Sequence, residues 1–181
     1  MIGMITLCKM ALLVALAMAG VWLSSGSADA ARMWLPKANN PYCDITTYMA
    51  RELPEQAMSM LDRNGKPVIV MSAATLAAEP AYGGFLMAHE CCHHSLGHVG
   101  RYREGLGHVG PQPFFYIKPA LRQMELDADC CAVKMLRERQ QAESISSAAQ
   151  AMQVFGDAPT GAYYPTGLER AENIAKCASE D

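Results

Sequence analysis

The stretch His89-Glu90-Cys91-Cys92-His93 carries the His-Glu-x-x-His pattern of a zinc hydrolase. Two histidines four residues apart in a helix lie about 40° apart around its axis and one turn along it, so both imidazoles can reach one ion. Glu90 then lies beside the ion rather than on it, where its carboxylate can accept a proton from a water molecule. The stretch therefore predicts a helix that carries two metal ligands and a general base.

A third ligand is expected after this helix. A metzincin would have a histidine at position 99, but this chain has Val99 there and His98 one residue out of register. Glu125 and Asp129 lie four residues apart, on one face of a later predicted helix. Glu125 can complete a His₂Glu site for one zinc ion, and Asp129 can bind the free ring nitrogen of a ligand histidine. His94 and His98 are predicted to face the surface or a loop.

The two motifs, His-Glu-x-x-His and then Glu-x-x-Ala-Asp, resemble those of the gluzincin metallopeptidases related to the CaaX prenyl endopeptidase, especially their small soluble bacterial members. The resemblance implies a zincin-like domain in which His89, His93 and Glu125 bind zinc. It further implies that Glu90 is the general base and that Asp129 supports the ligands.

The resemblance extends over about residues 55–175. Family members often have a late His-Pro pair followed by a helix with an arginine, and this chain has Tyr164-Pro165 and then Arg170. A phenol in this loop, from Tyr163 or Tyr164, would stabilise an oxyanion if it reached the cleft; packing or surface exposure is the alternative. The membrane-embedded family members also have several transmembrane helices, and no such helix is predicted after the leader of this chain.

The amino-terminal segment has the composition of a secretory signal peptide. Lys9 precedes an apolar run, residues 10–23, and the small residues Ala28 and Ala30 mark a cleavage site after Ala30. The run is shorter than the about 20 residues that a membrane span needs. We therefore expect residues 1–30 to be removed on export and the protein to be periplasmic or secreted without a stable membrane anchor; an uncleaved anchor is the alternative.

The remaining residues, 31–181, have the length of one domain. The net charge of −3 and the absence of a basic patch argue against a nucleic-acid partner. The fold class expected is α+β, mostly helical, with a small antiparallel β-hairpin and two helices that carry the site. Residues 32–42 are predicted to be an irregular lead-in.

The hairpin is predicted at residues 57–63 and 66–71, because Asn64-Gly65 suits a type I′ turn. Pro67 cannot donate to a ladder and favours an edge strand. Gly83 and Gly84 predict close backbone packing. Prolines, glycines and apolar periodicity predict helices at residues 80–98, 119–139, 144–155 and 165–178.

Six of the seven cysteines follow the leader: Cys43, Cys91, Cys92, Cys130, Cys131 and Cys177. An even number in an exported protein suggests disulfides, and the sequence alone allows 15 full pairings. The two adjacent pairs lie on the two motif helices, so we predict a disulfide between these helices. Cysteines at two of these places in similar family members favour Cys91 with Cys130, and Cys43 with Cys177 is the further pairing expected. A separate four-cysteine zinc site is the alternative.

The sequence therefore predicts a zinc metalloendopeptidase with a peptide or protein substrate. Zinc and Glu90 would supply the chemistry, and an edge strand of the hairpin would align an extended peptide by β-addition, as the family resemblance implies. Two other classes stay open: a non-catalytic, zinc-stabilised peptide-binding module, which would not need Glu90, and a metal-handling accessory protein.

Overall fold

The computed structural model describes residues 35–53, 55–101, 113–161 and 163–180. The chain divides into two units, Met1–Met33 and Trp34–Asp181, and all that follows concerns described residues of the second unit. The predicted signal peptide lies outside them. None of the helices in the described part of the chain combines the length and the apolar character that a membrane span requires.

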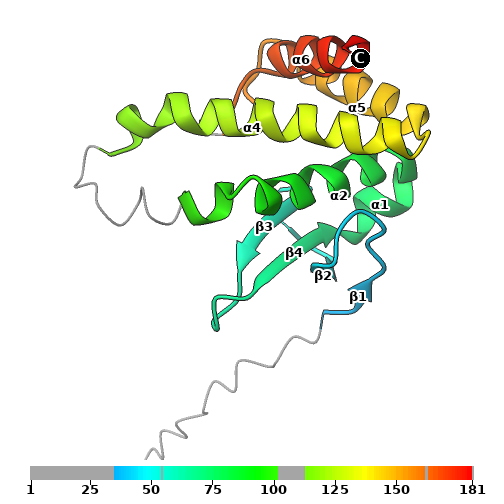
Figure 1. Cartoon of the computed structure of the whole chain (residues 1–181), viewed down its shortest axis with the longest axis vertical. Coiled ribbons are helices and arrows are strands. Elements are labelled where there is room, and N and C mark those ends of the chain that lie inside the picture. The colour runs from blue at the N-terminus through cyan, green and yellow to red at the C-terminus, as the bar shows by residue number, and fades with distance from the viewer. Residues whose placement is uncertain (1–34, 54, 102–112, 162, 181) are drawn as a thin grey trace, which may run out of the picture. The chain divides into compact units, whose positions relative to one another are not determined.

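The second unit is a mostly helical α+β fold, as predicted, and its sheet is mixed (Figure 1). The strands are β1 (Lys37–Ala38), β2 (Thr46–Ala50), β3 (Ala57–Leu61) and β4 (Pro67–Ser72), in the order β1-β2-β4-β3. Strands β2 and β4 are parallel, whereas the other neighbours are antiparallel. The predicted antiparallel hairpin, β3–β4, is present, but the sheet is wider than predicted and β1 lies in the segment expected to be irregular.

The turn of the hairpin differs from the type I′ turn predicted. The dihedral angle φ is positive at Gly65 (76°) but not at Asn64. The Gly65 N–H donates to the carbonyl of Asp62 over 2.9 Å, and the Asp62 carboxylate accepts from the backbone N–H groups of Asn64 and Lys66. The loop is therefore a three-residue connection that ends on a left-handed glycine, and the acid before it holds it closed.

Pro67 begins β4, which is a central strand, so the edge-strand prediction was wrong. The proline is paired with Leu61 on β3, but the pairing of β4 with β2 begins only at Val68. A proline as the first residue of a strand removes no donor from the second ladder, which explains why it is tolerated here. The edge strand of the hairpin is β3.

In the part of the chain that the structure describes, helices pack against the sheet and against one another. They are α1 (Ala73–Ala78), α2 (Pro80–Ser95), α4 (Pro113–Glu138), α5 (Ala142–Phe155) and α6 (Gly167–Ser179). Helix α2 ends before the predicted His98, because the left-handed Gly97 (φ 70°) terminates it. Helix α4 begins earlier than predicted and continues through Pro119, at the cost of one backbone hydrogen bond. Gly156, also at positive φ, ends α5 as predicted.

Helix α2 is the centre of the core. It packs against β3 and β4 on one side and against α4 and α5 on the other (Figure 1). Phe85 of α2 is fully buried. Gly83 permits the close approach of α1, because a Cβ atom there would lie 2.5 Å from the Leu76 Cδ1. The close packing predicted for Gly84 is confirmed too, with a built Cβ 3.0 Å from the Tyr42 hydroxyl.

Three disulfides are present among the described residues: Cys43–Cys91, Cys92–Cys131 and Cys130–Cys177. The predicted bond between the two motif helices is confirmed, but it joins Cys92 to Cys131. Both predicted pairings, Cys91 with Cys130 and Cys43 with Cys177, were wrong. Neighbouring residues on a helix point about 100° apart, so adjacent cysteines reach different partners. Three disulfides indicate an oxidising, extracellular environment.

Candidate metal centre

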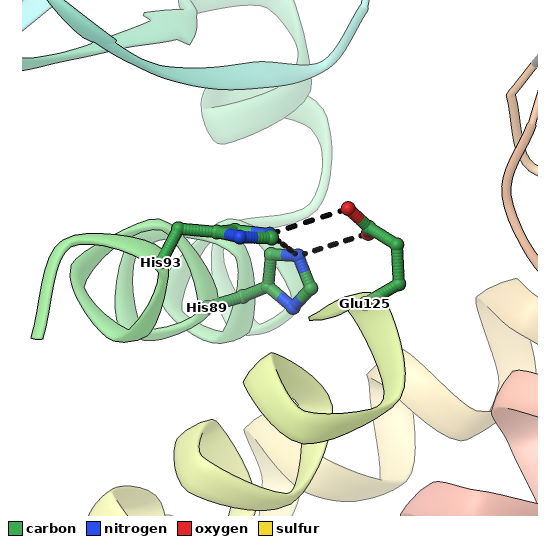
Figure 2. Close-up of side chains that lie close together, drawn as sticks. All are labelled: His89, His93 and Glu125. Atoms are coloured by element: carbon green, nitrogen blue, oxygen red, sulfur yellow. Dashed lines mark hydrogen bonds and ion pairs between the residues drawn. The ribbon is translucent and has the colours of Figure 1, made fainter. Parts of the chain in front are cut away.

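Helices α2 and α4 bring His89, His93 and Glu125 together (Figure 2). The Nε2 atoms of the two histidines lie 2.9 Å apart. Each of them lies 3.3 Å from an oxygen of the Glu125 carboxylate. Ligands about 2.0–2.1 Å from a tetrahedral ion lie about 3.3–3.4 Å from one another, which is close to this triangle. The three side chains can therefore hold a metal ion.

The charges at the centre are set by neighbouring groups, whose effects on the pKa values outweigh that of burial. Burial alone would lower the pKa of His89, but the carboxylates of Asp129 and Glu125 raise it to about 10. Burial would likewise raise the pKa of Glu125, but His89 and His93 hold it well below its usual value. A buried carboxylate thus stays ionised between two imidazoles, and a cation at this point would be attracted by the same charge.

Asp129, fully buried on α4, lies behind His89. Its Oδ1 is 2.9 Å from the His89 Nδ1, a contact that is an ion pair when the ring is protonated. Arg170 of α6 donates to both Asp129 oxygens, from Nε over 2.9 Å and from Nη2 over 2.6 Å. Burial opposes ionisation of Asp129, but Arg170 lowers the pKa of the carboxyl below its usual value. The carboxylate thus faces the ligand ring that it was expected to support.

Arg170 was noted in the sequence only through the family pattern, without a partner. It is buried, and its Nη1 also lies 3.6 Å from Glu125 and 3.3 Å from the Thr160 hydroxyl. A buried carboxylate such as Asp129 needs a charged partner. This need is the signal that could have pointed to an arginine, although not to its position.

Glu90 lies next to the three ligands without belonging to them. Glu90 is 6 % exposed, and its Oε2 accepts a hydrogen bond of 2.5 Å from the hydroxyl of Ser59 on β3. The carboxylate belongs to the same cavity as His89 and His93. The structure therefore places Glu90 beside the three side chains. Ser59, which was not predicted from the sequence, contacts Glu90 there.

His98 and His94 were predicted to face the surface or a loop; His98 is instead buried, and His94 is half-buried. His98 is 2 % exposed, and its Nδ1 lies 3.0 Å from the Nδ1 of His93. Burial, followed by His93 and Arg101, lowers the pKa of His98 to about 4, so the ring is neutral at physiological pH. His94 is half-buried, with its Nε2 3.1 Å from the carbonyl of Val68 on β4. The left-handed Gly97 turns His98 back onto the ligand helix, which the helical pattern had not indicated.

A cavity of about 550 Å³ opens at the centre. Its walls include the three ligands, Glu90 and Arg170, part of β3 from Ala57 to Ser59, and Tyr164. Tyr164 is half-buried, and its carbonyl accepts a hydrogen bond of 3.1 Å from Arg122. The tyrosine thus lies at the wall of the cavity.

Comparisons with protein-family models, with curated proteins and with solved structures gave no match to this chain. The gluzincin resemblance therefore rests on the motif residues alone, and the function is argued from the geometry of the site.

Proposed function

We propose that the protein is a zinc-dependent metallopeptidase that hydrolyses peptide bonds, with one zinc ion bound by His89, His93 and Glu125. The observation that carries the proposal is the pairing, in one cavity, of a three-ligand group with a separate carboxylate, that of Glu90. Two imidazoles and one carboxylate are a donor set typical of catalytic zinc, with a position left for water. A structural zinc site would be closed by a fourth ligand.

Zinc at this centre would polarise the scissile carbonyl and lower the pKa of a water molecule. Glu90 would accept the proton of the attacking water and deliver it to the leaving nitrogen. Asp129, held by Arg170, would keep the His89 ring turned so that its Nε2 faces the ion. The Tyr164 phenol is proposed to donate to the developing oxyanion.

The substrate proposed is an extended peptide that pairs with the edge strand β3. The backbone N–H of Asp62 donates to the Lys66 carbonyl, and that of Ser72 donates to the Gln56 carbonyl. These two bonds show which residues of β3 form backbone hydrogen bonds with β4 and which do not. The backbone N–H and C=O groups of residues 58 and 60 therefore point to β4, whereas those of residues 57, 59 and 61 point away from it. Ala57 and Ser59 are also at the cavity wall. A peptide added at this edge would run along the site.

The compartment proposed is the periplasm or the outside of the cell, reached with residues 1–30 as a signal peptide. Three disulfides support an oxidising location.

The proposal is tested with three variants of the full chain. Glu90→Gln should retain about one zinc per molecule and lose casein hydrolysis, because it removes the base without removing a ligand. His93→Ala and Glu125→Ala should lose both zinc and activity. Metal is measured by atomic emission, and hydrolysis with and without a chelator. A wild-type protein that binds zinc but cleaves no peptide would instead be a binding module.

A further inference from the structure

The side chain of Ser59 contacts Glu90 twice. Its hydroxyl lies 2.5 Å from the Oε2 and 2.8 Å from the backbone carbonyl of Glu90. A hydroxyl has one proton, so it donates to one of these two oxygens at a time and stays close to the other. The two residues are 31 positions apart and come from different elements, a strand and a helix.

The backbone N–H and C=O groups of Ser59 point away from β4. In the ladder between β3 and β4, the N–H and C=O groups of Ser59 point to the open edge of the sheet, where an extended peptide would pair. Ser59 is also at the wall of the cavity, together with Glu90. One residue thus links the edge that would hold the substrate with the group that would act on it.

We propose that Ser59 is a positioning residue. Its hydroxyl turns the Glu90 carboxylate towards the attacking water, and its backbone sets the distance between the substrate strand and that carboxylate. The inference rests on the proposed peptidase function, and it assigns a role to a residue outside both metal motifs. Ser59 itself binds no metal, so its removal should act on catalysis and not on zinc.

The test uses zinc-loaded, full-length Ser59→Ala and Ser59→Thr. The alanine variant should bind the wild-type amount of zinc and lose about ten- to a hundredfold in kcat, as expected for one hydrogen bond to a charged group, with little change in KM. Threonine keeps the hydroxyl and suits a strand, so it should recover most of the loss. Ser146→Ala is the matched control, because that exposed hydroxyl on α5 donates to the nearby Glu143 carbonyl and lies outside the site.

A second measurement does not depend on activity. Crystal structures of the zinc-loaded wild type and Ser59→Ala should show the Glu90 carboxylate displaced in the variant. An unmoved carboxylate, or a Ser59→Ala variant that hydrolyses peptides at the wild-type kcat, would overturn the inference while leaving the peptidase function intact. Absence of any Glu90-dependent hydrolysis in the wild type, with the carboxylate displaced as expected, would instead overturn the peptidase function and leave the positioning contact standing.

Discussion

At the scale of single residues, the two ligand histidines are oriented by different partners. The ring nitrogen of His89 that faces away from Glu125 meets a carboxylate, that of Asp129. The corresponding nitrogen of His93 meets the neutral ring of His98 over 3.0 Å. A His93 ring that binds an ion through Nε2 must carry its proton on Nδ1, and the unprotonated Nδ1 of His98 can accept it. His98 therefore completes the support of the ligands.

We expect His98→Ala to weaken zinc binding by about ten- to a hundredfold, the usual cost of removing a partner of a ligand. His94→Ala is the control, because His94 lies on α2 next to His93 and contacts the Val68 carbonyl instead of a ligand. Competition with a fluorescent chelator measures both affinities. Equal zinc affinity in His98→Ala and wild type would show that the His98 contact does not hold the ligand.

At the scale of elements, three helices are joined by one chain of charged contacts. His89 on α2 meets Asp129 on α4, which in turn is bound by Arg170 on α6. The asparagine of α6, Asn173, adds a bond of 2.9 Å to the Leu126 carbonyl of α4. Helix α6 begins with a capping box, in which Thr166 and Glu169 satisfy each other's backbone donors, so its first turn holds Arg170 in place.

Arg170→Met should destabilise the fold by about 3–5 kcal/mol, because it leaves the Asp129 carboxylate buried without its charged partner. Lys176→Met on the same helix is the control: its pair with Glu180 is exposed, and its loss should change the unfolding free energy by less than about 0.5 kcal/mol. Urea unfolding followed by circular dichroism compares the two. A loss for Arg170→Met no larger than that for Lys176→Met would contradict the structural role assigned to the buried pair.

At the scale of the whole unit, the three disulfides link successive segments of the chain. They close consecutive stretches of chain, from Cys43 to Cys91, from Cys92 to Cys131 and from Cys130 to Cys177, with sequence separations of 48, 39 and 47. The three bonds join the segment before β2 to α2, α2 to α4, and α4 to α6. Helices α2, α4 and α6 are thereby cross-linked, whereas β3, which carries Ser59, is joined to the site by non-covalent contacts.

Reduction of the disulfides should lower the stability strongly and release the metal. Each loop of this length restricts the unfolded chain by about 4 kcal/mol in the chain-entropy model. Thermal unfolding with and without a strong reductant, with thiols counted and zinc measured after each step, checks this expectation. The double variant Cys92→Ala/Cys131→Ala isolates the bond between the ligand helices. Unchanged melting and metal content after full reduction would show that packing alone holds the site.

The sequence by itself determined the features that depend on near neighbours. The i, i+4 spacing placed His89 and His93 on one face of a helix, and Glu125 and Asp129 on one face of another. The β3–β4 hairpin and the end of α5 at Gly156 followed from the same local rules, because periodicity and turn chemistry act over a few residues.

Only the tertiary structure decided which distant residues meet. The partners of Cys91 and Cys130, the parallel pairing of β2 with β4, and the contacts of Ser59, His98 and Arg170 depend on how helices rotate and pack and on strand register. A shift of one residue along a helix turns a side chain by about 100°, so the choice between adjacent cysteines is set by packing of the whole unit and not by spacing. Local spacing thus placed the candidate ligands on single faces of two helices, and the fold brought those faces and their supporting partners together.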